Sequence, residues 1–540
     1  MMGIAVLREN TLGVSKVNPS VNVLDFFQTQ IIPELQETTG RRPVLQATAL
    51  KFICTFRFQF SREQLAGLLP AIIQHLSSKT VAVHTYACYT LDRMLVTTEA
   101  MEGAGAKQYK LQNTDLSPVL ESMFNGLFSI VENVGAGENE YAMKCVTRTL
   151  ATAAQDVVPV HEFVIQKLTA VLAVVAKNPR QPQFNHYLFE SIALLVRSVC
   201  SKDASSVART MEPLLFPPFT AILTQDVAEF QPYVFQVLAQ LLEYRTGGVG
   251  EAYTNLFTPI ISVCLWNDTG NVPALTRLLK AYIVKATESV LPHLQGILGI
   301  YQKLMAIPAS EEHGYAVIRC VMVHVPLENL EQHMATIFTI MLTPLKIRET
   351  QRRLRLITNF FAMFVARLGP QMFFTCMDRV QQNLGATLLG TVWTRRLATI
   401  PASTAIEAKE QVLAATRLLC ESPVLEGNQQ LWLQLFVGIA SMLTSPMLSS
   451  VHDAEGSGEP AAPTKMVYDS TYSRLSFAFR PEEDYFASTT NASQAFCTAV
   501  QTFWTTHPWM PQVQAALTAS EDPKLASGLQ QVFQQAGVQL

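Results

Sequence analysis

Residues Lys177 to Arg197, KNPRQPQFNHYLFESIALLVR, contain the unit from which most of the chain is built. The two prolines in KNPRQP disrupt a helix, because proline lacks an N–H and clashes with the preceding turn, so we expect a linker here. In the following run, Leu188, Ile192 and Leu195 fall on one helical face. Val160 to Val175 forms another apolar helical run ahead of the linker. The unit is therefore helix, short linker, helix.

The same unit recurs along the chain. The second helix of each unit opens with a tyrosine, or once with an alanine, and successive openers lie 55, 46, 46, 41 and 41 residues apart. These openers are Tyr86, Tyr141, Tyr187, Tyr233, Ala274 and Tyr315. The residue after each opener starts an i, i+4, i+7 series, and five of the six series are apolar or nearly so. A period in the forties predicts an all-α fold, a HEAT- or armadillo-like right-handed superhelical solenoid of antiparallel helix pairs.

Composition agrees with a long continuous core and excludes some functions. Of the 540 residues, 49% are hydrophobic and only 15% are charged, which is too apolar for a disordered scaffold. Lysine and arginine number 40 against 43 acidic residues, a net charge of −3. Because phosphate neutralisation supplies most of the affinity of nucleic-acid binders, we expect no nucleic-acid partner.

The sequence shows no motif for catalysis, metals or cofactors. The nine cysteines lie too far apart for a zinc site, and no phosphate loop, HExxH or GxSxG motif occurs. His186, at a helix start, is interpreted as a capping or packing residue. We therefore expect no enzymatic activity, no cofactor and no metal.

The chain also lacks membrane and targeting signals. Its first residues do not have the pattern of a secretory signal peptide. The longest apolar runs, Ile357 to Val365 and Leu431 to Leu443, fall short of the roughly 20 residues that cross a bilayer. We therefore expect a soluble protein without membrane insertion.

The order of apolar and polar stretches predicts four regions. Residues 1–20 are expected to be loose, 21–445 to form the HEAT-repeat solenoid, 446–467 to be a disordered loop, and 468–540 to cap the C-terminal end. The loop contains HDAEGSGEPAAPT, which is polar and rich in glycine and proline. Closing helices are expected at Ser493 to Thr505 and Ala526 to Ala536, because a solenoid must cover its last apolar face.

Several segments, in the same order along the chain, resemble the exportins of the cellular apoptosis susceptibility type, which belong to the importin-beta (karyopherin) superfamily and return importin-alpha to the cytoplasm. The segments are VNVLDFFQTQIIPEL (Val21 to Leu35), VHTYACYTLDR (Val83 to Arg93), ENEYAMK (Glu138 to Lys144), KNPRQPQFNHYLFESI, DVAEFQPYVFQVLAQLLE (Asp226 to Glu243), LWNDTGNVPALTRLLKAY (Leu265 to Tyr282) and YDSTYSRLSFA (Tyr468 to Ala478).

The resemblance implies a nuclear transport receptor with two partners. Such a receptor binds importin-alpha together with Ran in its GTP form in the nucleus and releases it after GTP hydrolysis, so it shuttles between nucleus and cytoplasm. This chain resembles only the C-terminal part of the family's superhelix. We expect that the family's N-terminal Ran-binding repeats have no counterpart in this sequence, and the resemblance then implies that Ran binding is weakened or lost.

One cluster of basic residues is a candidate partner surface. In LKIRETQRRLRLITNFFAMFVARLG, Arg348, Arg352 and Arg355 are predicted to share one helical face, opposite Leu354 and Ile357. Such a face is either simply solvated or meets an acidic surface of Ran or importin-alpha.

The sequence therefore predicts an export receptor for importin-alpha. The alternative is a generic HEAT-repeat scaffold or regulatory subunit that does not depend on Ran.

Overall fold

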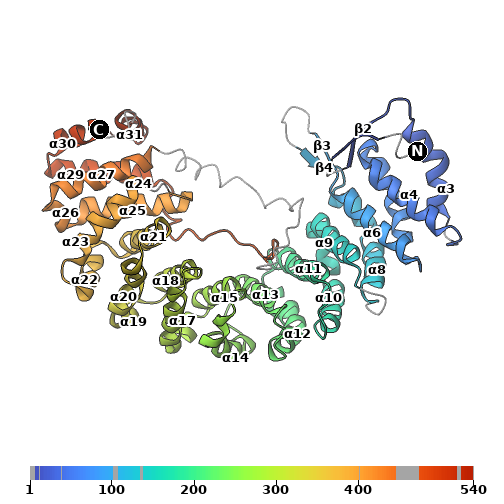
Figure 1. Ribbon diagram of the computed structural model, residues 1–540, viewed down its shortest axis with the longest axis horizontal. Coiled ribbons are helices and arrows are strands. Elements are labelled where there is room, and N and C mark those ends of the chain that lie inside the picture. The colour runs from blue at the N-terminus through green and yellow to red at the C-terminus, as the bar shows by residue number, and fades with distance from the viewer. Residues whose placement is uncertain are drawn as a thin grey trace. The chain divides into compact units, whose positions relative to one another are not determined.

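The computed structural model describes residues 6–10, 13–37, 39–100, 107–133, 138–399, 402–444, 474–519 and 525–538. The chain divides into two compact units: residues 1–252 with 461–480, called unit 1, and residues 253–460 with 481–540, called unit 2. Both units consist of antiparallel helix pairs (Figure 1). The first helix of a pair is called the A helix and the second the B helix.

Unit 1 begins with a β-hairpin and continues with five helix pairs. The hairpin strands are β1 (Val6–Asn10) and β2 (Gly13–Val17). The A helices are α2–α3 (Val23–Phe26 and Ile32–Gln36, joined by a π turn at Phe27–Ile31), α5 (Arg62–Gln74), α7–α8 (Asn113–Leu116 and Leu120–Val131), α10 (His161–Val175) and α12 (Glu212–Thr224). The B helices are α4 (Pro43–Phe56), α6 (Val81–Leu95), α9 (Glu140–Ala153), α11 (Pro182–Cys200) and α13 (Gln231–Tyr244).

Unit 2 continues the same pattern. Its A helices are α14 (Glu251–Ile260), α16–α17 (Thr287–Val290 and Leu294–Ala306), α19–α20 (Leu327–Leu330 and Met334–Ile347), α22 to α24 (Pro370–Val380, Leu384–Leu388 and Thr394–Thr399), and α26–α27 (Pro423–Glu426 and Gln429–Leu443). Its B helices are α15 (Val272–Lys285), α18 (Glu311–His324), α21 (Gln351–Leu368), α25 (Ala405–Glu421) and α29 (Ala492–Thr506). Two helices follow, α30 (Met510–Thr518) and α31 (Leu525–Gln535).

Within each unit the B helices form one layer. In unit 1, α4 packs on α6, α6 on α9, α9 on α11 and α11 on α13; in unit 2, α15 packs on α18, α18 on α21, α21 on α25 and α25 on α29. The A helices form a second layer, as where α10 packs on α12 and α17 on α20. Each repeat therefore buries its apolar face against its neighbours, as in HEAT solenoids.

The predicted register of the B helices is confirmed in five of the six repeats, because all fifteen positions of those series are buried. The exception is α18, where Ala316 and Val323 are only half-buried and Ile318 and Val321 are buried instead. Ala316 lines a cavity, which explains why it is only half-buried.

Local capping residues set several helix starts. Ser61 and Gln64 form a capping box at α5, and the Asn139 side chain accepts hydrogen bonds from the backbone N–H groups of Tyr141 and Ala142 at α9. The Thr350 side chain caps α21 in the same way. These caps satisfy the free N–H groups of the first turns, so the helices begin where the sequence supplies such a residue.

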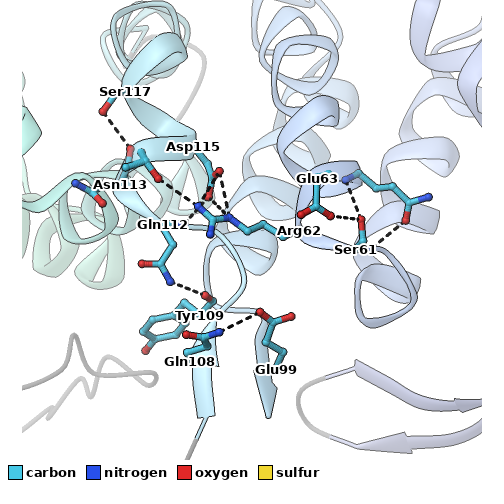
Figure 2. Close-up of polar contacts among 12 residues, drawn as sticks. Ser61, Arg62, Glu63, Glu99, Gln108, Tyr109, Gln112, Asn113, Asp115 and Ser117 are labelled. Atoms are coloured by element: carbon cyan, nitrogen blue, oxygen red, sulfur yellow. Dashed lines mark hydrogen bonds and ion pairs between the residues drawn. The ribbon is translucent and has the colours of Figure 1, made fainter. Parts of the chain in front are cut away.

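Polar side chains also tie one repeat to the next. The Arg62 guanidinium, at the start of α5, holds the Asp115 carboxylate with Nε–Oδ2 at 3.0 Å and Nη2–Oδ1 at 3.2 Å, as Figure 2 shows. Asp115 also accepts the backbone N–H of Gln112, which caps α7. The Thr147 hydroxyl of α9 lies 3.1 Å from the carbonyl oxygen of Tyr187 in α11. These bonds fix the stacking of adjacent repeats.

Some regions differ from the expectation. Residues 1–20, expected to be loose, contain the β1–β2 hairpin. A second pair of strands within unit 1, β3 (Thr98–Ala100) and β4 (Lys107–Tyr109), was not predicted. The proposed disordered loop at 446–467 lies outside the described residues.

The C-terminal region is partly as predicted. The two closing helices are confirmed as α29 and α31. The helix α30 and the stretch from α23 to α24 were not predicted, because Pro508 and Pro511 lie before and within the first turn of the former and glycines interrupt the latter. Residues 468–540 were expected to form the C-terminal cap, but residues 474–486 do not belong to it. Residues 475–477 bind α11 and α13 in unit 1, and residues 484–485 contact α18 and α25 in unit 2.

Within the described residues, Glu140–Val175 is long and apolar enough to cross a membrane by length and composition. The stretch is interrupted, because α9 ends at Ala153 and a 3₁₀ turn at Ala154–Val160, with φ 48° at Ala154, separates it from α10. Helices α9 and α10 both pack in the solenoid core. The expectation of no membrane insertion remains a prediction.

Candidate protein-binding surfaces

The structure separates the three predicted arginines. Arg348 follows the last residue of α20 and has an extended backbone, with φ −155° and ψ 120°. Helix α21 begins only at Gln351. The prediction that Arg348 shares a helical face with Arg352 and Arg355 is therefore wrong, because two residues between the helices, Glu349 and Thr350, break the helical register.

The other two arginines lie on the exposed side of α21. The Arg352 Nη2 lies 3.1 Å from Glu312 Oε2, and both side chains of this ion pair are about half exposed, at 45% and 58%. The Arg355 Nη1 donates to the Ser403 hydroxyl. Both guanidinium groups are thus held in place at the surface, where an acidic partner could reach them.

Arg353, which the sequence did not single out, has a structural role. Its guanidinium binds the buried Glu311 carboxylate, with Nε 2.9 and 3.0 Å from the two oxygens. It also donates to the carbonyl oxygens of Pro344 and Arg348 at 2.9 and 2.7 Å. Arg353 therefore joins α18, α20 and α21.

A cavity of about 220 Å³ lies beside Arg355 in unit 2. Its charged lining includes both signs: Lys280, Arg319 and Arg355 with Glu312, Glu407, Glu410 and Glu482. Burial raises the pKa of the Glu410 carboxyl, while the Arg319 guanidinium at 2.7 Å opposes that change. Because Arg319 of α18 pairs with Glu410 of α25 inside the cavity and also donates to the Asn359 carbonyl oxygen of α21, this pair connects the three helices.

A second charged group, missed by sequence reasoning, lies in unit 1. We call it the Asp92 cluster: Asp92, Arg93, Lys144 and Arg148, from α6 and α9. The buried Asp92 carboxylate lies 3.4 Å from Arg148, 3.8 Å from Arg93 and 3.9 Å from Lys144. Arg93 and Lys144 retain 29% and 26% of their side-chain exposure, so a partner can reach them.

Aromatic rings surround the basic groups of the Asp92 cluster. The Arg93 guanidinium lies over the Tyr89 ring at 5.1 Å, and the Lys144 ammonium lies 5.7 Å from the centroid of the Tyr187 ring. Tyrosine and arginine are enriched where protein partners bind most tightly. A search of the sequence for runs of charge does not find the Asp92 cluster, because Arg93 and Lys144 lie in different repeats.

His186 is a packing residue, as predicted. It is buried, its Nδ1 lies 3.2 Å from the Tyr233 hydroxyl, and burial lowers its pKa to about 4. Among the residues that the structure describes, no group of three or more His, Cys, Asp or Glu side chains is placed to hold a metal ion.

Comparison with known proteins gives the same family for both ends of the chain. A family model described as "CAS/CSE protein, C-terminus" matches residues 92–527, and one described as "Cse1" matches residues 1–91. The chain is 32% identical to Exportin-2 of Drosophila melanogaster over 541 residues, which cover 98% of this chain and 54% of that protein. It is 30% identical to Exportin-2 of Homo sapiens over 483 residues, covering 87% and 48%.

Solved structures show the same fold. "The exportin Cse1 in its cargo-free, cytoplasmic state" superimposes with a TM-score of 0.79 at 24% identity, over 98% of this chain and 53% of that one. Importin beta superimposes with a TM-score of 0.54 at 11% identity, over 96% and 57%. These likenesses confirm the predicted HEAT solenoid. The chain spans about half the length of the curated relatives it matches.

Proposed function

This chain belongs to the CAS/CSE family, and from that premise we propose that it acts as a nuclear export receptor that binds importin-alpha together with Ran in its GTP form. The observation that carries the proposal is the family match over residues 92–527, together with 32% identity to an Exportin-2 along 98% of the chain. These matches confirm the family that the sequence segments resemble.

The proposed receptor works by binding and not by catalysis. Two stacked helix layers give each unit one row of B helices, and the side chains of this row that stay exposed offer a surface for a protein partner. The Asp92 cluster and the Arg352–Arg355 face of α21 supply basic groups on that layer, which suit acidic surfaces on Ran or importin-alpha. Hydrolysis of GTP on Ran would then release the cargo. The receptor would shuttle between nucleus and cytoplasm.

A pull-down tests the proposal. The purified 540-residue protein is expected to retain importin-alpha when Ran carries a non-hydrolysable GTP analogue, and to retain about ten-fold less when Ran carries GDP. The reason is linkage: if Ran-GTP raises the affinity for importin-alpha, importin-alpha raises the affinity for Ran-GTP by the same factor. The amount of each protein retained is measured with and without importin-alpha, for Ran in each of its two nucleotide states.

Two other outcomes of the pull-down would contradict the proposal. Equal retention of importin-alpha with either nucleotide would favour the alternative, a HEAT-repeat scaffold that does not depend on Ran. If neither partner is retained, the proposed function is wrong for this chain.

The arginines of α21 give a second prediction. Changing Arg352 and Arg355 to Glu is expected to weaken importin-alpha or Ran binding about ten-fold at about 50 mM salt and clearly less at about 300 mM, because salt screens exposed charges. Arg348→Glu alone is expected to have a smaller effect. The affinities are measured by titration at both salt concentrations.

The matched control changes Lys303 and Arg379 to Glu, on the A helices α17 and α22, with the same change in net charge. This control is expected to bind like the parent. If both double variants lose affinity equally, net charge and not the α21 face explains the effect.

A further inference from the structure

Residues 474–480, of sequence RLSFAFR, pack against α11 and α13 of unit 1 (Figure 1). Leu475, Phe477 and Ala478 are buried, whereas Phe479 is 49% exposed. The backbone N–H of Phe479 donates to the carbonyl oxygen of Ser476 at 3.3 Å, so the segment forms a tight turn. It belongs to no helix or strand, and side chains of other elements hold it.

Three side chains hold the segment by its backbone, and we call them the amide clamp: Glu190 of α11 with Gln236 and Gln240 of α13. The N–H groups of Ser476 and Phe477 donate to the two Glu190 oxygens at 2.6 and 3.0 Å. The Leu475 N–H donates to Gln236 Oε1 at 2.9 Å. Three successive N–H groups therefore converge on the clamp.

The rest of the clamp also contacts the backbone of the segment. The Gln240 Nε2 donates to the carbonyl oxygens of Ala193 and Phe477, at 2.9 and 3.3 Å. The Arg197 guanidinium lies 5.3 Å from the centroid of the Phe477 ring. Because most of these hydrogen bonds go to backbone groups, they recognise the shape of a turn. Side-chain identity matters at the buried Leu475 and Phe477 positions and at Ser476, whose side chain also hydrogen-bonds Glu190.

An empty clamp would leave the buried Glu190 carboxyl group without hydrogen-bond donors, which would destabilise the fold. The Glu190 side chain is 0% exposed, and burial raises its pKa to about 7 even though the N–H groups of Phe477 and Ser476 lower it. His186 faces it from the same helix, with Nε2 3.7 Å from Glu190 Oε1. A buried carboxyl group of this kind needs hydrogen-bond donors, so the clamp has to be filled by a peptide or by water.

The resident segment does not use every group in the clamp. The Gln240 Oε1 is buried and, among the described residues, accepts no hydrogen bond. A ligand with one more donor at this point would satisfy an atom that residues 474–480 leave without a partner. A peptide that supplies this donor would therefore form one hydrogen bond with the clamp that the chain's own segment does not form.

We propose that the amide clamp is a binding site for a turn-forming peptide from a partner protein, and that residues 474–480 occupy it in cis. The peptide would carry apolar side chains at its first and third turn positions, as Leu475 and Phe477 do here, and a further donor for Gln240. It would come from a loop or an unstructured segment, because the N–H groups inside a helix or a central strand are already paired. Binding of this peptide displaces residues 474–480, so the site is competitively self-inhibited.

The tethered segment sets the strength of the competition. Because residues 474–480 belong to the same chain as the clamp, they compete at an effective concentration of about 1 mM, so a peptide of equal intrinsic affinity binds the parent only at higher concentrations. Weakening the resident segment must therefore increase binding of a free peptide. This consequence is independent of Ran and importin-alpha.

The test uses the full chain and a fluorescein-labelled peptide, RLSFAFR, with capped ends. The variant Leu475→Ala/Phe477→Ala is expected to bind this peptide at least about ten-fold more tightly than the parent, because its own segment no longer competes. Adding Glu190→Gln to that variant should remove the gain. Phe479→Ala, which changes an exposed residue of the same turn, is the matched control and should bind like the parent. Affinities are measured by fluorescence anisotropy.

The outcome is decisive in either direction. If the double variant binds the peptide no better than the parent, or if binding is unchanged by Glu190→Gln, residues 474–480 are a fixed part of the fold and the proposal is wrong. If the double variant does not fold, hydrogen exchange on the parent replaces it. There, an excess of unlabelled peptide, about 5 mM, should speed exchange at residues 475–477, and unchanged exchange would overturn the proposal.

Discussion

Replacing Arg319 with alanine is expected to lower the free energy of unfolding of unit 2 by about 3–5 kcal/mol, because it leaves a buried carboxylate without its partner. The Arg319 Nη2 donates to Glu410 Oε1 at 2.7 Å, and its Nη1 donates to the carbonyl oxygen of Asn359 at 3.0 Å. The Glu410 side chain is almost completely buried. The loss is measured by amide hydrogen exchange in α18 and α25, which the pair connects.

Arg352→Ala is the matched control. Arg352 also forms an ion pair with a glutamate on α18, Glu312. Because both side chains of this pair are exposed, removing Arg352 should cost less than about 1 kcal/mol. The double change Arg319→Met/Glu410→Met should recover most of the loss, because it removes both buried charges. If Arg319→Ala costs no more than Arg352→Ala, the buried pair does not stabilise unit 2.

The size of the Arg319→Ala effect should depend on pH. Burial raises the pKa of the Glu410 carboxyl, and the Arg319 guanidinium opposes this rise. Removing Arg319 therefore raises the pKa of Glu410 further. A carboxyl group with a raised pKa in the folded state contributes its stability fully below its unfolded pKa and loses it as pH rises through the folded pKa. The loss of stability relative to the parent should therefore be larger at about pH 8 than at about pH 5.

Replacing Trp432 with alanine is expected to lower the free energy of unfolding of the C-terminal helices by about 3–5 kcal/mol. Its buried ring stacks on Phe436 and Phe503, with centroids 5.2 and 5.6 Å apart, and meets the Trp509 ring edge at 5.4 Å. The ring thus joins α27 to α29 and to the start of α30. Its loss leaves a large cavity and separates these helices. Urea denaturation followed by near-ultraviolet circular dichroism measures the effect.

Trp432→Phe separates packing from hydrogen bonding. The Trp432 Nε1 donates to the carbonyl oxygen of Leu419 at 2.9 Å, a bond that phenylalanine cannot form. Phenylalanine keeps most of the ring stacking, so this variant should lose only about 1–2 kcal/mol. An equal loss in both variants would mean that the hydrogen bond, and not the aromatic cluster, holds the helices together.

The sequence predicted the repeat architecture because the determinants are local. The position of apolar residues along a helix decides which face is buried, and prolines and capping residues decide where helices begin. Leu188, Ile192 and Leu195 are all buried as their spacing predicted. The prediction was wrong for α18, where Ala316 lines a cavity and is only half-buried.

The break before α21 could have been found. Thr350 accepts a hydrogen bond from the Arg353 N–H and is the N-cap of the helix, a role that threonine commonly has. Reading the arginines only by their spacing placed Arg348 on a helix that had not yet begun. The Asp92 cluster could not be found in this way, because its members come from different repeats.

The amide clamp had no local signal at all. Glu190 lies in an apolar stretch and reads as an ordinary polar residue of a helix, and Gln236 and Gln240 have no charge to draw attention. Their partners lie 237 to 287 residues away in the sequence. Only the folded structure brings these groups together.

Because of this long separation, the ribosome makes the clamp well before it makes the segment that fills it. Ser476 follows Glu190 by 286 residues, so at a synthesis rate of about 5–20 residues per second the ribosome finishes α11 about 15–60 s before the turn that fills the clamp is made. During this interval unit 1 can already stack its repeats, because each contacts only its neighbours. Every newly made molecule therefore passes through a stage in which the site is open, and a chaperone or an early partner can occupy it first.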